Sequence, residues 1–285
     1  MEIDDTGEVR DYRFQEGMIR SRERMTYTAV ASILLDQDSS ECARYAALVP
    51  QLEQMRELAL LLHGKRQQRG SIDFDLPEAE LTLDESGRMT NILQSERNVA
   101  HRIIEEFMLL ANESVARELR KRKLPGIHRV HPDPDSENLE ELRQFVSLFG
   151  ISCGDLSSRK ETTKLLAAIR KHPIAQVLRI KLLRSLKQAC YRASPDGHYG
   201  LAKNDYLHFT SPIRRYADLV VHRIVTGILR GEKRPAPDIG KLKGIAKHIS
   251  ITERNSVDAE RESVKTKLVA YFDRVLREYD LRCHK

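Results

Sequence analysis

The sequence lacks tryptophan, pairs of neighbouring cysteines and long apolar runs. Its four cysteines, Cys42, Cys153, Cys190 and Cys283, form no C-x-x-C motif, which argues against a structural zinc site. Scattered cysteines are typical of free thiols in a reducing compartment. No apolar run approaches the ~20 residues that a membrane span needs. The acidic first residues do not resemble a signal peptide. We therefore expect a cytoplasmic protein that does not span a membrane.

The composition is that of an ordinary globular protein, with 40% hydrophobic and 32% charged residues. Its 285 residues allow one large domain or two small ones. We predict a single domain over residues 1–285, because the chain contains no long linker, internal repeat or low-complexity tract. The net charge of +6 fits a phosphate-bearing partner and ordinary surface charge equally well.

The spacing of apolar residues predicts an α+β fold that is mostly helical with a small antiparallel sheet. Alternation with a period of two predicts strands mainly within residues 71–94. Short strands are also expected near 127–131 and 197–209. Steps of three and four residues, together with start and stop signals, predict helices over 28–35, 41–68, 96–121, 136–149, 160–170, 174–190, 213–230 and from 239 to the C-terminus.

The segment GHYGLAKNDYLHFTSPIRRYADLVVHR, residues 197–223, is rich in groups that suit a phosphodiester. Arg214 and Arg215 lie near the start of the predicted helix, where free N–H groups and the helix dipole favour an anion. An arginine fork can hold two phosphate oxygens at once. Thr210 and Ser211 could bind phosphate or simply cap the helix.

The aromatic residues of this segment offer faces on which bases can stack. They are Tyr199, Tyr206, Phe209 and Tyr216. The residues alone leave a second interpretation open, because Thr-Ser-Pro is an ordinary helix start and the aromatic rings could belong to the core.

The run HFTSPIRRYADLVVHR, residues 208–223, resembles the signature of the ribonuclease II / ribonuclease R (RNB) exoribonuclease family. GHYGLA, just before it, resembles the family's glycine-rich lead-in. Four more segments match family patterns in the same order. They are IRSRERMTYTAV (19–30), IIEEFMLLANESVA (103–116), PGIHRVHPDP (125–134) and ITERNSVDAERES (251–263). The resemblance covers residues 12 to about 271 and corresponds to the later part of the family's catalytic domain.

The resemblance implies roles for three candidate catalytic residues. Arg214 matches the arginine that contacts the phosphate at the scissile bond, where its donors would stabilise developing charge. Tyr27 matches a tyrosine that helps hold the last nucleotides at the catalytic end of the RNA channel. Glu260 matches a glutamate that supports the terminal nucleotide.

Other residues are implied as RNA contacts. Arg215 stands where the family accepts arginine or lysine. Glu106, or its neighbour Glu105, matches a nucleotide-contacting carboxylate, and Phe74 matches an aromatic residue near the RNA 3′ end. Thr210, Ser211 and His208 complete the candidates. Each has an ordinary alternative, because most glutamates on charged helices are solvated and most histidines are structural.

The family's aspartate cluster, which holds Mg²⁺, has no counterpart here. The sequence contains no D-x₅-D-x-D-D arrangement, and neither Asp4-Asp5 nor the pair Asp73 and Asp75 replaces it. The OB-type barrels that flank the family's catalytic domain are also absent. The resemblance therefore implies Mg²⁺ with ligands mostly outside this chain, and we assign no metal ligand within it.

Three explanations remain open: a truncated or split gene product, a subunit that pairs with an Asp-bearing partner chain, or a degenerate relative. They lead to two hypotheses. In the first, the chain is part of a 3′-to-5′ hydrolytic exoribonuclease that degrades single-stranded RNA to nucleoside 5′-monophosphates. In the second, it is a non-catalytic RNA-binding or interaction module.

Overall fold

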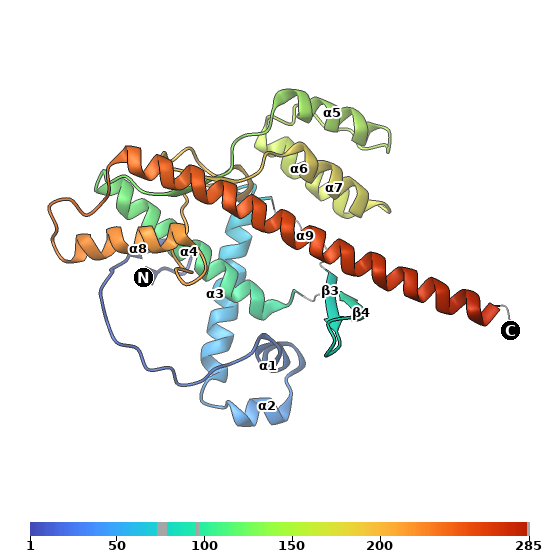
Figure 1. Ribbon diagram of the computed structural model, residues 1–285. Helices are drawn as coiled ribbons and strands as arrows, with labels where there is room; N and C mark the ends of the chain where they lie inside the picture. The colour runs from blue at the N-terminus through green and yellow to red at the C-terminus, as the bar shows by residue number, and fades with distance from the viewer. Residues whose placement is uncertain (73–78, 95–96, 284–285) are drawn as a thin grey trace. The chain divides into compact units, whose positions relative to one another are not determined.

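The computed structural model describes residues 1–72, 79–94 and 97–283 (Figure 1). The helices are α1 (Tyr27–Ala31), α2 (Ser39–Arg44), α3 (Val49–Gln68), α4 (Val99–Lys121), α5 (Ser136–Ser147), α6 (Arg159–Arg170), α7 (Ala175–Ser185), α8 (Tyr216–Leu229) and α9 (Ile239–Cys283). The strands are β1 (Glu2–Ile3), β2 (Val9–Asp11), β3 (Ala79–Leu83), β4 (Met89–Gln94), β5 (His128–Val130) and β6 (Cys190–Arg192). The predicted α+β class with dominant helices is confirmed.

The strands form three antiparallel pairs, β1–β2, β3–β4 and β5–β6. The β3–β4 hairpin confirms the strands predicted within 71–94, and β5 confirms the piece near 127–131. The strand expected within 197–209 is reduced to isolated bridges at His198, Lys203 and Leu207, and the partner of β5 is β6 instead. The prediction failed there because Gly197 has a positive φ of 82° and a short 3₁₀ turn, Tyr199–Leu201, interrupts the extended backbone.

Two compact units can be distinguished along the chain. The first comprises residues 1–74 and 97–247, and the second comprises residues 75–96 and 248–285. In the second unit, the Arg274 side chain of α9 donates to the Met89 carbonyl of β4 at 2.6 Å. The single domain stays a prediction, because this division describes compactness and not independent folding.

Helix α4 packs against α3 and α1 in the first unit. Asn98 caps its N-terminus by accepting from the backbone N–H groups of Ala100 and His101, and Arg120 and Lys121 lie in its last turn, where they suit the helix dipole.

The single helix predicted over 41–68 is wrong. It is divided into α2 and α3 by a turn at residues 45–48, and Pro50 stands in the first turn of α3, where its missing N–H costs nothing.

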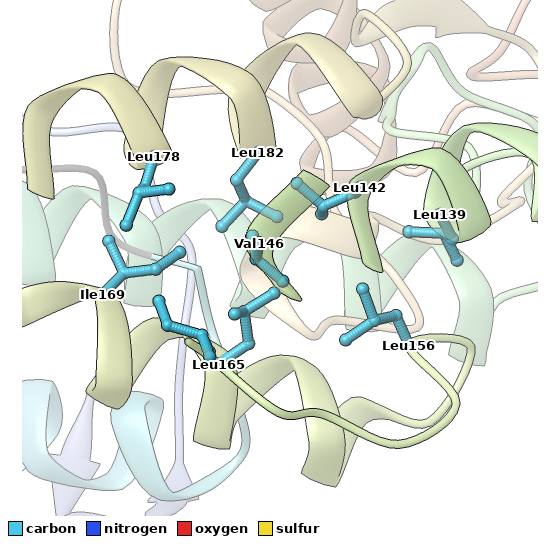
Figure 2. Close-up of a cluster of buried hydrophobic side chains, with 9 residues drawn as sticks. Leu139, Leu142, Val146, Leu156, Leu165, Ile169, Leu178 and Leu182 are labelled. Atoms are coloured by element: carbon cyan, nitrogen blue, oxygen red, sulfur yellow. The ribbon is translucent and has the colours of Figure 1, made fainter. Parts of the chain in front are cut away.

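Helices α5, α6 and α7 share a core of their own, shown in Figure 2. Leu139, Leu142 and Val146 of α5 recur at three- and four-residue steps and face Leu165 of α6 and Leu178 of α7. Each such buried side chain stabilises the fold by about 1.5–3 kcal/mol.

No helix in the described ranges is both long and apolar enough to cross a membrane. Cys42, Cys153 and Cys190 are free thiols, as expected from their spacing.

Candidate nucleic-acid interface

The segment just before Arg214 is hydrogen-bonded to a buried amide side chain on α4. Asn112 is almost fully buried, and its Oδ1 accepts hydrogen bonds from the backbone N–H groups of Phe209 (2.9 Å) and Thr210 (3.3 Å). Its Nδ2 donates to the Tyr206 hydroxyl at 3.0 Å. Three hydrogen bonds from one side chain therefore attach residues 206–210 to α4.

A buried carboxylate fixes the following turn. Asp218, in the first turn of α8, has no exposed surface, and its Oδ1 accepts from the Ser211 N–H at 2.8 Å. Arg215 donates to both carboxylate oxygens of Asp218, from Nε at 2.9 Å and from an Nη at 2.8 Å. The guanidinium group of Arg215 is thus hydrogen-bonded within the protein. Asp218 is a structural anchor in the helix's first turn.

Arg214 has a different environment. Its side chain is exposed, and its Nε donates to the Ser211 hydroxyl oxygen at 3.2 Å. No carboxylate pairs with Arg214 in the described part of the chain. Helix α8 begins at Tyr216 and not near Ile213, because residues 211–215 form a turn in which the N–H groups of Arg214 and Arg215 bond to the Ser211 carbonyl. Arg214 therefore projects from a rigid turn just before a helix N-terminus.

The aromatic side chains of this region are mostly internal. Tyr199 and Tyr206 are buried. Phe209 stacks on His222 with ring centroids 4.0 Å apart, and the His222 Nε2 lies 2.8 Å from the Phe209 carbonyl. Tyr216, by contrast, is 49% exposed. Of the four rings considered for base stacking, Tyr216 is the most exposed, and Phe209 is half-buried.

His208 and His198 lie among these rings, each next to Tyr206. The Nδ1 of His208 is 3.0 Å from the Tyr191 hydroxyl. Burial, reinforced by Arg215, Arg129, His198 and Arg214, lowers the pKa of His208 to about 2. Burial and the nearby His131 lower the pKa of His198 to about 3. Both imidazoles are therefore neutral near pH 7. The position of His208 supports a structural role more than a direct contact with RNA.

We call residues 211–215 the Arg214 turn. Tyr27 and the segment that leads into this turn are both supported by the same face of α4. The half-exposed ring of Tyr27 stacks on His101, with centroids 3.9 Å apart. His101 and Asn112 are eleven residues apart, so they project from nearly the same side of the helix, about 16 Å apart along its axis. Glu105 falls between them on this face.

The two candidate glutamates of α4 have opposite environments. The Glu106 side chain is 3% exposed, and its Oε1 accepts from Nε and Nη of Arg66 at 3.0 and 2.8 Å and lies 3.0 Å from Nδ1 of His63. The Glu105 side chain is 31% exposed, pairs with Arg97 and lies 3.7 Å from an Nη of Arg66. This difference favours Glu105 as the residue that can reach a nucleotide.

Two other candidates lie outside the described part of the first unit. Glu260 is exposed on α9 in the second unit. Phe74 lies outside the described residues. Both roles stay predictions.

The residues that the structure describes do not fit a metal ion. The described ranges contain no group of three or more His, Cys, Asp or Glu side chains that could hold one. The only aspartate at the turn, Asp218, is occupied by Arg215 and the Ser211 N–H. We therefore derive no step through a metal from this chain.

Asn112 is the site residue that the sequence analysis missed. It lies in the segment 103–116 that matches a family pattern, but one asparagine in an amphipathic helix carries no local sign of a buried anchor.

We expect Asn112→Ala to lower the free energy of unfolding by about 1–3 kcal/mol, because two partly buried N–H donors lose their acceptor. Urea unfolding measures this. The exposed Asn204→Ala is the control and should change stability by less than about 0.5 kcal/mol. Equal effects of the two variants would contradict the anchoring role.

Comparisons with known proteins show which proteins this chain resembles. The family model described as "RNB domain" matches residues 1–231. The chain is 39% identical to Ribonuclease R 1 of Lactococcus lactis over 288 residues, which covers 98% of this chain and 35% of the relative. It is 36% identical to Ribonuclease R of Escherichia coli, covering 92% of this chain and 34% of the relative. The chain thus spans about a third of the length of these relatives.

Solved structures show the same similarity. Mycoplasma genitalium RNase R in complex with ribose-methylated single-stranded RNA superposes with a TM-score of 0.75 at 29% identity, over 83% of this chain and 38% of that one. The same enzyme in complex with double-stranded RNA also gives a TM-score of 0.75, over 83% of this chain and 43% of that one.

Proposed function

Because this chain belongs to the RNB domain family, we propose that it forms the RNA-contacting later part of a 3′-to-5′ hydrolytic exoribonuclease. The product would be nucleoside 5′-monophosphates. The observation that carries the proposal is the Arg214 turn. Asn112 and Asp218 hold its backbone, and Arg214 stays exposed with no carboxylate partner among the described residues.

Each residue of the turn has a role in this proposal. Arg214 contacts the phosphate at the scissile bond, and Ser211 orients the guanidinium through its hydroxyl. The N-terminus of α8 adds positive potential. Tyr27 and Glu105 contact the last nucleotides along the same face of α4. Arg215, Thr210 and Asp218 keep the turn rigid, since the Arg215 fork is bonded within it.

The metal and the remaining catalytic carboxylates come from elsewhere in this proposal. Mg²⁺ would neutralise charge on the phosphate, held mostly by ligands outside this chain, which a preceding segment or an Asp-bearing partner chain supplies. The alternative, a non-catalytic RNA-binding module on the same fold, needs neither. Both proposals place the chain in the cytoplasm with single-stranded RNA as partner.

RNA binding by the chain itself is the first test. We expect a labelled single-stranded RNA to bind weakly, with an affinity that falls steeply as salt rises from about 50 to about 200 mM, because phosphate contacts release counterions. Fluorescence anisotropy measures both quantities. An affinity that does not change with salt would count against RNA binding through phosphates, and both forms of the proposal would then fail.

A further inference from the structure

A cavity of about 760 Å³ lies along one face of α8, directly beside the Arg214 turn. Tyr216, Arg223 and Arg230 line it. They recur every seven residues, so they lie on one side of the helix. The loop of residues 230–238 and the first turns of α9 form the opposite wall. We call this cavity the α8 groove. All of its lining residues belong to the first unit.

The wall of the groove depends on a close approach at Gly227. A Cβ atom at this position would lie 2.9 Å from Cβ of Pro235. The Glu232 N–H bonds to the Gly227 carbonyl at 2.9 Å, which brings the loop back against the helix. Contacts within the fold therefore fix the position of this loop against α8, and with it the wall of the groove.

The groove carries an excess of positive charge. Four cationic side chains line it, against two carboxylates: Arg223, Arg230, Arg234 and Lys241 against Glu232 and Asp238. Arg230 pairs with Glu16 at 3.1 Å, and Asp238 accepts the Lys241 backbone N–H at 2.9 Å. Within the described ranges, the other three cations form no ion pair. Glu232 and Asp238 offset only part of this charge, so the lining keeps a net positive charge that attracts a polyanion.

The remaining lining suits a nucleic-acid strand better than a free anion. Tyr216 offers an exposed ring at the end next to Arg214, and Leu219, Pro235 and Pro237 add apolar surface. A positive groove with an aromatic platform is the arrangement that binds single strands without reading sequence. Arg223 lies two helical turns beyond Tyr216, about 10 Å along the axis. A strand held at Arg214 can thus continue past Tyr216 to Arg223.

We propose that the α8 groove binds the phosphodiester backbone of single-stranded RNA, adjacent to the nucleotides held at the Arg214 turn, with Arg223, Arg234 and Lys241 on phosphates and Tyr216 under a base. This proposal rests on the proposed function, and it adds a second contact region on the same strand.

The test compares two triple variants of the full chain. The groove variant carries Arg223→Gln, Arg234→Gln and Lys241→Gln. The control variant carries Lys160→Gln, Arg170→Gln and Lys171→Gln, which removes three exposed charges on and beside α6. All six positions are exposed, so both variants should fold, and circular dichroism verifies this. The probes are labelled oligouridylates of about 4 and about 16 nucleotides.

We expect the groove variant to bind the longer RNA about tenfold more weakly, with a salt slope reduced by about 2 for three lost phosphate contacts. The short RNA, which occupies only the Arg214 turn, should lose little. The control variant should stay within about twofold of the parent for both RNAs. Tyr216→Phe should keep the affinity for the longer RNA, and Tyr216→Leu should lower it, because only the ring stacks on a base.

The test separates a failure of the proposed function from a failure of the α8 groove alone. A parent chain whose RNA binding is absent or independent of salt overturns the proposed function and this inference together. A parent that binds in a salt-dependent way, with equal losses in the groove and control variants, overturns only the α8 groove. The groove is also overturned if millimolar inorganic phosphate abolishes the difference between the two variants, because a free-anion site would then explain it.

Discussion

We expect Arg214→Lys to lower the turnover of a completed enzyme by about 10²–10³-fold, the usual cost of losing one preorganised donor at a developing charge. The completed enzyme is this chain with the aspartate-bearing segment of a relative supplied in trans or by fusion. Lysine keeps the charge but not the planar fork. General attraction to RNA is spread over many phosphates, so the affinity should change little by comparison.

Arg215→Lys is the matched contrast, because the adjacent arginine has a different environment. Its fork is bonded to both oxygens of the buried Asp218. We expect this variant to lower stability, since lysine cannot make the two-point contact and leaves a buried carboxylate poorly paired. Turnover, RNA affinity and urea unfolding should therefore separate the two variants.

Two outcomes would contradict this assignment. A turnover for Arg214→Lys within about twofold of the parent, far below the cost of a lost donor, would remove Arg214 from the active site. Robust Mg²⁺-dependent release of mononucleotides by the chain alone would show that it contains a metal site that the described residues do not reveal. If no segment restores activity although RNA still binds, the non-catalytic module is favoured.

Acidification from pH 7 to pH 5 should lower the free energy of unfolding by about 2–4 kcal/mol through two histidines alone. The pKa values of His208 and His198 are lowered in the folded protein, to about 2 and about 3. The unfolded chain, with histidine pKa values near 6.5, then binds more protons than the folded one. Stability is consequently full above about pH 6.5 and falls as the pH drops below it. Most carboxylates titrate below this window.

Urea unfolding at pH 7, 6 and 5 measures this dependence. His208→Gln removes one of the two groups, so stability should fall less steeply with pH, whatever the variant's absolute stability. His248→Gln, which removes an exposed histidine, should retain the parent's slope. If the slope of His208→Gln equals that of the parent, His208 is not neutral and buried as described.

The sequence by itself determined most of the local elements and indicated the family. The four-residue steps of apolar side chains between 96 and 121 predicted α4, and the two-residue alternation before and after residues 84–87 predicted the β3–β4 hairpin. These patterns depend only on near neighbours, so the sequence contains them in full. The long run around HFTSPIRRY was sufficient to indicate the RNB family, because many consecutive residues match the family's signature, and the family model matches residues 1–231.

Only the tertiary structure shows which of two adjacent, chemically identical side chains is exposed. Glu105 and Glu106 differ by about 100° around α4. Arg66, forty residues away, bonds to Glu106 at 2.8 Å and lies 3.7 Å from Glu105, and only the folded chain shows that Glu106 is the buried one. Arg214 and Arg215 are the same residue type at adjacent positions. Asp218 binds one of them and leaves the other exposed, and Asn112 attaches the turn from almost a hundred residues away. Periodicity cannot reveal such contacts, because they depend on which side chains meet after the chain has folded.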